Sequence, residues 1–317
     1  MLNYLSGIES HLAYKNPCVI MPIFRISIIL SLFFFTFCKK EVTANKDDNP
    51  GYTKKTIRYK SLANTDDNLI SLDLYSYAGI SSPKPVVVYI HGGGWVTGDK
   101  ANKLNNKTAL FNSLHYLFVS VNYRLSPYPS DILNTNRIKY PDHNNDVADA
   151  VKWVIDSIGK YGGDPSKIVL LGHSSGAHLV SLTGTSQLFL PARNILLSSL
   201  KGIASIDTEG YDVISQSSEE LYVNAFGKDQ HIQAQASPVY NLTTSHTYPP
   251  FFIAKRGTQE RIALANAFIS KLQLTGTQVT QVNGSQYDHE GINDAIGNPN
   301  DAVITPVLTS FLQGCFQ

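Results

Sequence analysis

The sequence predicts an α/β protein built on a mostly parallel sheet of about eight strands, with an antiparallel hairpin at its start and helices on both faces. Two apolar runs, residues 86–90 and 168–171, show no alternation with polar residues, which is typical of strands buried on both faces. From residue 85 onward, strand-like segments alternate with segments of helical apolar spacing, and this order favours a parallel sheet. Before that point, residues 55–60 and 69–75 alternate apolar and polar side chains around turn-forming residues, as an antiparallel hairpin does.

The remaining elements follow from the same patterns in chain order. We expect strands at residues 116–122, 201–206, 250–254 and 278–282, and helices at 102–114, 147–158, 261–274 and 302–311, with a further helix opening at 177–182. Residues 207–248 form the longest interval without a central strand, so we expect them to arch over the sheet and shape a substrate pocket. Because the sequence has no internal repeat and no second core, residues 55–317 are expected to form one domain, preceded by an N-terminal segment (1–38) and a polar tether (39–54).

Composition and charge exclude some classes of partner. The 317 residues include 26 Lys and Arg and 25 Asp and Glu, so neither nucleic acid nor an acidic polymer is indicated. The three cysteines, Cys18, Cys38 and Cys315, are too few and too far apart for a disulfide framework or a zinc site. We therefore expect no metal and no cofactor, and the sequence leaves the oligomeric state open.

The N-terminal segment differs from the rest of the chain. Residues 26–37 form an apolar run after Arg25 that has the length of a signal-peptide core and is short for a bilayer span. Cys38, directly after this run, resembles the lipidated cysteine of a bacterial lipoprotein, although Phe37 stands where a small residue is usual. We expect export to a bacterial cell envelope and lipid attachment to the membrane through Cys38. The alternatives are a secreted soluble protein, an uncleaved anchor or a buried apolar segment.

A Gly-x-Ser-x-Gly pattern, Gly172 to Gly176, lies between a predicted strand and a predicted helix. A strand that turns into a helix within a few residues leaves no room for side chains at the two flanking positions, which explains both glycines. The residue at the apex, Ser174, is then exposed with a helix N-terminus behind it. The pattern also occurs in ordinary turns, but its position after a buried strand indicates a serine nucleophile. His173 and His178 are expected to point away from the apex.

Three consecutive glycines, Gly92 to Gly94, follow the first central strand. Glycine can adopt backbone conformations closed to other residues, so the N–H groups of this loop can point into a cavity and favour an oxyanion there. A flexible turn is the alternative. Loops after successive parallel strands meet at the carboxyl edge of the sheet, so this loop is expected to lie beside Ser174. His91, at its start, is expected to orient the loop.

These motifs resemble those of the α/β-hydrolase esterase and lipase family, in the branch with a His-Gly-Gly-Gly loop. The matching pieces are His91–Trp95, Asn122–Leu125, Gly163–Pro165, Gly172–Gly176 and Asp288–Gly291, in this order within about residues 55–314. The resemblance implies a two-step acyl transfer in which Ser174 attacks an ester carbonyl and His289 acts as general base. It also implies an oxyanion hole made by the backbone N–H groups of Gly93, Gly94 and Ser175.

The acidic member of the catalytic group is open between two residues. The family commonly has an aspartate three residues after a glycine that follows the strand expected here at residues 250–254. In this sequence Glu260 takes that place after Gly257. A glutamate can hold the imidazole tautomer as an aspartate does, although an acidic residue is also favourable by itself at the start of a helix. Asp207, at the end of the preceding strand, reaches the same edge and is the alternative. A third possibility is that neither residue serves.

The function that follows is hydrolysis of small or aromatic carboxylic esters by a serine esterase. An arylformamide or amide hydrolase could use the same machinery, and a hydrolase-like binding module without catalysis would retain only the fold. Trp95, Tyr123, Tyr211 and Phe226 are candidates for an apolar acyl pocket, although such aromatic residues also occur as plain core.

Overall fold

The structure, a computed structural model, describes residues 52–77 and 83–317. The predicted signal segment, Cys38 and nearly all of the predicted tether lie outside the described residues. The first strand begins at Tyr52, three residues before the predicted start of the domain at Lys55.

All eight predicted strands are present, and they form one sheet. Their bounds in chain order are β1 (Tyr52–Arg58), β2 (Ser71–Tyr77), β3 (Lys84–Ile90), β4 (Leu117–Val121), β5 (Gly163–His173), β6 (Leu200–Ile206), β7 (Phe251–Lys255) and β8 (Val279–Asn283). Their order across the sheet is β1-β2-β4-β3-β5-β6-β7-β8. β2 pairs antiparallel with both β1 and β4, and the other neighbours pair in parallel. The prediction of a mostly parallel sheet with an N-terminal antiparallel hairpin is therefore confirmed.

The side chains of the central strands alternate between two hydrophobic cores, one on each face of the sheet. On β3, Val86, Val88 and Ile90 belong to one core, whereas Val87 and Tyr89 belong to the other. All five side chains are buried, which explains why this stretch of sequence shows no polar alternation.

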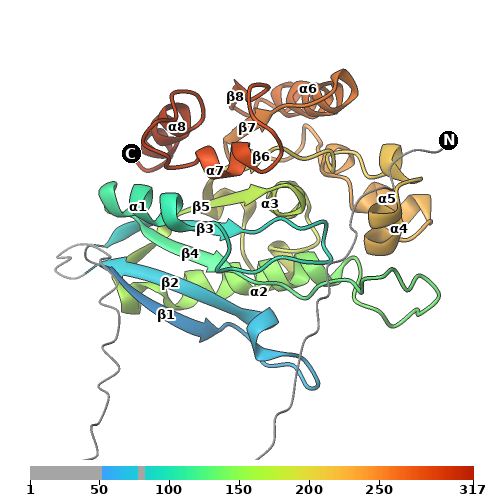
Figure 1. Ribbon diagram of the computed structural model, residues 1–317, viewed down its shortest axis with the longest axis horizontal. Helices are drawn as coiled ribbons and strands as arrows, with labels where there is room; N and C mark the ends of the chain where they lie inside the picture. The colour runs from blue at the N-terminus through green and yellow to red at the C-terminus, as the bar shows by residue number, and fades with distance from the viewer. Residues whose placement is uncertain (1–51, 78–82) are drawn as a thin grey trace, which may run out of the picture. The chain divides into compact units, whose positions relative to one another are not determined.

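Helices cover both faces of the sheet, as predicted. One core takes side chains from α2 (Asp142–Ser157), α3 (Ser175–Thr185) and α6 (Gln259–Leu274). The other takes them from α1 (Asn105–Ser113), α7 (Gly291–Ala295) and α8 (Thr305–Cys315). Figure 1 shows α1 and α2 on opposite sides of β3 and β4. Within the described ranges, no helix is both long enough and apolar enough to cross a membrane.

Among the element boundaries that differ from the prediction, two have a clear physical reason. α2 begins at Asp142 instead of Val147 because its polar first turns are partly buried, and the carboxylate of Asp146 accepts hydrogen bonds from N and Nε of Arg124, both at 2.8 Å. The spacing of apolar residues cannot reveal a helix turn that buries an ion pair instead of apolar side chains. β5 begins at Gly163, five residues before the predicted apolar run at 168–171, because Gly163 pairs with Lys84 of β3 before a shift in register.

The segment between β6 and β7 contains α4 (Glu220–Phe226) and α5 (Gln230–Gln235). Figure 1 shows both helices beyond the arrowheads of β3 and β5, at the carboxyl edge of the sheet. α4 is tied to the loop that precedes α2, because Arg137 Nε donates to Asn224 O at 3.2 Å and Asn224 Nδ2 donates to Pro127 O at 2.8 Å. The segment therefore forms a wall over this edge, as the sequence indicated.

Candidate active site

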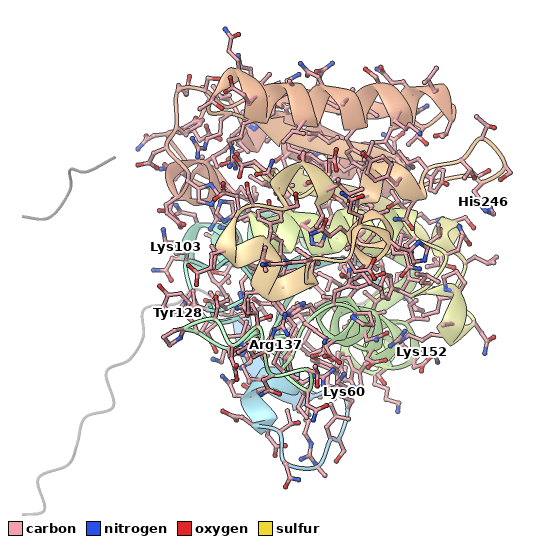
Figure 2. All side chains as sticks on the ribbon, turned by 90° about the vertical axis from the view of Figure 1, so that its right-hand side faces the viewer. Lys60, Lys103, Tyr128, Arg137, Lys152 and His246 are labelled. Atoms are coloured by element: carbon pink, nitrogen blue, oxygen red, sulfur yellow. The ribbon has the colours of Figure 1, made fainter. Side chains whose placement is uncertain are left out.

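Ser174 lies at the sharp turn between β5 and α3, at the carboxyl end of β5. Figure 2 views the molecule from the right-hand side of Figure 1, where α4 and α5 lie. Its backbone has φ 55° and ψ −122°, a strained conformation for a residue other than glycine. A Cβ atom on Gly172 would lie 2.3 Å from Gly176 O, and one on Gly176 would lie 2.1 Å from Ile90 O. No side chain fits at such distances, so both flanking positions require glycine.

A chain of two hydrogen bonds joins Ser174, His289 and Asp207. Ser174 Oγ lies 2.9 Å from His289 Nε2, and His289 Nδ1 lies 2.7 Å from Asp207 Oδ2. Because a carboxylate can only accept, Nδ1 carries the proton, and in the neutral ring this leaves Nε2 free to accept from the Ser174 hydroxyl. The three residues follow β5, β6 and β8, so the carboxyl ends of three strands bring them together.

Asp207 is almost completely buried, with 2% of its surface exposed. Burial by itself would raise the pKa of Asp207, but the hydrogen bond from His289 and the positive charge of Arg261 outweigh it and hold the pKa below its ordinary value. Asp207 therefore remains ionised beside the imidazole at neutral pH.

Glu260, the acid that the sequence placed first, does not contact His289, and the structure brings Asp207 there instead. Thr258 caps the N-terminus of α6, and Glu260 lies in the exposed first turn of that helix. The physical reason is direction, since adjacent residues of a helix point about 100° apart and it is Arg261 that faces the sheet edge. The expectation that Glu260 rather than Asp207 is the hydrogen-bond partner of His289 is therefore corrected to Asp207.

The residues expected to hold an oxyanion lie around one cavity. The carbonyl of Gly93 accepts hydrogen bonds from the N–H groups of Val96 and Thr97, both at 3.1 Å, which fixes the turn of the glycine loop. Gly93, Gly94, Ser174 and Ser175 line the same cavity, and Ser175 is the first residue of α3. The positive end of α3 therefore lies behind Ser174.

The cavity beside Ser174 has a volume of about 310 Å³. Its apolar wall is made by Trp95, Leu221 and Tyr222, and its charged rim by Glu209, Arg261 and Glu290.

Of the four aromatic residues considered for this pocket, Trp95 alone is among the lining residues of the cavity. Tyr123, Tyr211 and Phe226 are buried in the hydrophobic core and do not line this cavity, so for these three the plain-core alternative holds. Leu221 and Tyr222 were missed because their helix, α4, carries no motif.

The other histidines near the site support it from outside the cavity. His91 Nδ1 lies 2.7 Å from Gly92 O, and its ring stacks on that of Tyr123, as expected for a residue that orients the glycine loop. His178 Nε2 lies 2.8 Å from Ala236 O, away from Ser174. His173 has a contact that the sequence did not indicate, because its Nε2 lies 2.8 Å from the backbone oxygen of His289.

His173, Asp207 and His289 bring potential ligand atoms within 4.8 Å of one another, close enough to hold a metal ion. In the structure these atoms are engaged in hydrogen bonds, His173 with the His289 backbone and Asp207 with the His289 ring. Burial and the neighbouring His289 ring hold the pKa of His173 below its ordinary value, so this side chain is neutral. The hydrogen bonds account for the cluster without an ion.

A parallel sheet with helices on both faces, a serine at the turn after β5 and a histidine after β8 define an α/β-hydrolase fold. Residues 72–193 match the model of the BD-FAE family. The probable carboxylic ester hydrolase LipM of Mycobacterium tuberculosis is 38% identical over 103 residues, which are 32% of this chain and 22% of that protein. The para-nitrobenzyl esterase of Bacillus subtilis is 29% identical over 143 residues, which are 43% of this chain and 29% of that protein.

Solved structures agree in fold. Inhibited esterase B from Lactobacillus rhamnosis superposes with a TM-score of 0.68 at 19% identity, covering 84% of this chain and 89% of that one. A truncated carbohydrate esterase from gut microbiota gives a TM-score of 0.66 at 16% identity, covering 84% and 98%. The chain has an α/β-hydrolase fold and is similar to carboxylesterases over part of its length, and its matches span less than a third of the length of the two curated relatives.

Proposed function

We propose that the protein is a serine hydrolase that cleaves carboxylic esters through an acyl-enzyme intermediate on Ser174. The single observation that carries this proposal is the hydrogen-bonded chain from Ser174 Oγ to His289 Nε2, at 2.9 Å, and from His289 Nδ1 to Asp207 Oδ2, at 2.7 Å. This is the arrangement of nucleophile, base and orienting acid that activates a serine hydroxyl.

In the proposed reaction, Ser174 Oγ attacks the ester carbonyl carbon while its proton passes to His289 Nε2. The bond between the carbonyl carbon and the alkoxy oxygen then breaks, and the leaving alcohol takes that proton from His289. A water molecule attacks the acyl-enzyme with the same histidine as base, which releases the acid and restores Ser174. Asp207 stays ionised throughout and stabilises the imidazolium.

The negative oxygen of each tetrahedral intermediate would be held by the backbone N–H groups of Gly93, Gly94 and Ser175. Support comes from their common position around the cavity beside Ser174 and from the start of α3 at Ser175. One such donor contributes about 100- to 1000-fold in rate when it is aimed at the developing charge.

The substrate class that fits is an ester with a small or aromatic acyl group. A cavity of about 310 Å³ with Trp95, Leu221 and Tyr222 on one wall matches a compact apolar group in size and polarity. The names of the relatives, which include a carboxylic ester hydrolase and a para-nitrobenzyl esterase, agree with ester substrates.

The first test is hydrolysis of short p-nitrophenyl esters by the full chain and its variants. We expect Ser174→Ala to abolish activity, and Asp207→Asn to lower kcat by about 10⁴-fold because the histidine tautomer is no longer held. Glu260→Gln should retain wild-type activity and serves as the matched acid control.

Three outcomes would contradict parts of this proposal. A large loss in Glu260→Gln with activity retained in Asp207→Asn would reverse the assignment of the acid. Faster turnover of a matched arylformamide than of the ester would favour an amide hydrolase. Equal inertness of wild type and Ser174→Ala on both substrates, with both proteins folded, would favour a binding module.

Export and lipid attachment through Cys38 form a separate proposal, which rests on sequence alone. The supporting features are the apolar run of residues 26–37 and the cysteine directly after it. Mass spectrometry of membrane-extracted protein should find a mature N-terminus at a lipidated Cys38. A mature N-terminus at any other residue would exclude the lipoprotein.

A further inference from the structure

Two arginines from the region after β7 hold the carboxylate of Asp207. Arg256 Nε donates to Asp207 Oδ2 at 2.6 Å, and Arg261 Nη2 donates to Asp207 Oδ1 at 2.7 Å. Arg261 Nε adds a longer bond to Oδ1 at 3.2 Å, and its Nη2 also lies 3.3 Å from the backbone oxygen of Asp207. Both arginine side chains are mostly buried, with 16% and 15% exposed. These are charge-assisted bonds inside the protein, where they are strongest.

The arrangement fixes the rotation of the carboxylate. Oδ2 is shared between His289 Nδ1, at 2.7 Å, and Arg256, whereas Oδ1 is taken by Arg261. A rotation of the carboxylate that turned Oδ2 away from the histidine would break the bonds to both arginines. Oδ2 therefore has one stable direction, which is toward the imidazole.

The position of Arg261 is unfavourable for a helix considered alone. Thr258 caps α6 and its side chain accepts from the Arg261 N–H, so Arg261 lies in the first turn, where the helix dipole disfavours a cation. Its charge is compensated by Asp207 and by Glu209, whose Oε1 lies 2.7 Å from Arg261 Nη1. Gly257 makes room for the arginine, since a Cβ there would lie 2.7 Å from Arg261 Cδ. The local sequence therefore favours the placement of this arginine against Asp207.

We propose that Arg261, assisted by Arg256, is a positioning residue for the reaction, which orients Asp207 toward His289 and keeps it ionised. This inference rests on the proposed function and adds a role at the site where the family pattern led us to expect an acid. The region after β7 supplies two cations here, and the acid comes from the end of β6.

Asp207 is faced by charged and titratable groups from every element packed around it. They are Glu209 and Tyr211 from its own loop, His173 from β5, Arg256 from the loop after β7, Arg261 from α6, and His289 with Glu290 from the loop after β8. The two arginines offset the charges of Asp207, Glu209 and Glu290, so removal of either increases the net negative charge around the imidazole.

The test compares Arg261→Gln and Arg261→Lys with Lys271→Gln, which removes an exposed cation from the last turn of the same helix. On a p-nitrophenyl ester, Arg261→Gln should lower kcat by about 10- to 100-fold with little change in KM, because misorientation of the acid affects the reaction and not substrate binding. Arg261→Lys should recover part of the loss, since lysine keeps the charge but not the forked geometry.

The pH profile provides a readout that a purely structural role would not move. Without the guanidinium, protonation of the Asp207–His289 pair becomes easier, so the acid limb of kcat/KM should shift to higher pH in Arg261→Gln. The profile of Lys271→Gln should match that of wild type. The proposal is overturned if folded Arg261→Gln matches Lys271→Gln in kcat and in the acid limb, or differs from it only in KM.

A spectroscopic measurement separates this proposal from the proposed function. The His289 Nδ1 proton, held by Asp207, should give a low-field proton NMR signal in wild type and Lys271→Gln that is broadened or lost in Arg261→Gln. If wild type shows no Ser174-dependent hydrolysis, the esterase proposal fails while this signal still decides the role of Arg261. An unchanged signal in Arg261→Gln would overturn the positioning role.

Discussion

Gly93 adopts a backbone conformation that a larger residue does not fit. Its φ is 118°, and a Cβ there would lie 2.1 Å from Thr97 O, inside the turn that fixes the glycine loop. Gly93→Ala should therefore displace the loop and lower kcat by about 100-fold or more if its N–H stabilises the oxyanion. Steady-state kinetics on a p-nitrophenyl ester check this.

Gly314→Ala is the matched control for that substitution. A Cβ at Gly314 meets no atom within 4 Å, and this residue lies near the end of α8, so activity should be unchanged. Wild-type kcat in Gly93→Ala would mean that this loop has no part in stabilising the transition state.

At the residue scale, the sequence identifies a candidate site residue where its neighbours in the sequence fix its backbone conformation. Ser174 could be predicted because the turn around it requires glycines within two residues on either side. The acid could not, because both Asp207 and Glu260 follow strands of the same edge and only side-chain direction separates them. Arg261 does carry a signal in retrospect, since a cation in the first turn of a helix needs an acidic partner.

At the scale of elements, α1 and Lys103, two residues before it, are bonded to α7 and to Glu290, the residue between His289 and that helix. Nζ of Lys103, a residue labelled in Figure 2, lies 2.7 Å from Glu290 Oε2. Asn106 Nδ2 donates to Asp294 O at 2.9 Å. Lys107 is fully buried, and its Nζ donates to Asn293 O at 2.8 Å. These three interactions anchor the loop that carries His289 to the α1 region.

Lys107 makes the stability of the protein depend on pH. Burial lowers the pKa of Lys107 from 10.5 to about 7, so between these values the unfolded chain binds more protons than the folded one. The stability of wild type should rise with pH through this window, by at most about 1.4 kcal/mol per pH unit from this group. The destabilising effect of the lysine is complete below pH 7 and lost as pH approaches 10.5.

Lys107→Met removes this dependence. In denaturant titrations, the variant's free energy of unfolding minus that of wild type should be larger at pH 6 than at pH 9, because the lysine destabilises the folded wild type more at pH 6. The hydrogen bonds that Lys107 Nζ donates to Asn293 O and Lys103 O are lost at both pH values, and the part of this loss that does not depend on protonation cancels in the difference. Lys152→Met, on the exposed face of α2, controls for removal of a positive charge. An equal difference at both pH values would contradict the prediction.

At the scale of the whole molecule, a buried ion cluster joins three distant parts of the chain. Asp146 on α2 is completely buried, and it binds Arg124 from the loop after β4 and Lys60 from the loop after β1. Figure 2 labels Lys60 at the lower side of the molecule. The cluster ties the antiparallel hairpin and the central sheet to the helix that covers them.

Asp146→Ala should lower the free energy of unfolding by about 3–5 kcal/mol, because it removes the buried partner of Arg124 and Lys60 and leaves them only the more exposed carboxylates of Asp142 and Asp149. Chemical denaturation measures this loss. The control is Asp156→Ala on the same helix, whose exposed pair with Lys152 should contribute less than about 1 kcal/mol. A loss as small as that of the control would show that Arg124 finds other partners.

The order of strands and helices could be predicted because burial on both faces leaves continuous apolar runs such as Val86 to Ile90. Elements that depend on buried polar contacts could not be predicted as well, and the first turn of α2 around Asp146 was missed for this reason. The walls of the pocket were also beyond prediction, since Leu221 and Tyr222 reach the site only through the path of the chain after β6.

The backbone at the site has a further consequence. Trp95, Ser174 and Asp207 all have positive φ, of 62°, 55° and 53°, and each follows the end of a strand. Such conformations cost of order 1 kcal/mol or more, most of all at Ser174, and the rest of the fold sustains them. Selection for thermostability alone would favour glycine at Ser174, the position whose hydroxyl the proposed reaction requires. This protein is therefore expected to show a trade-off between stability and activity centred on the turn after β5.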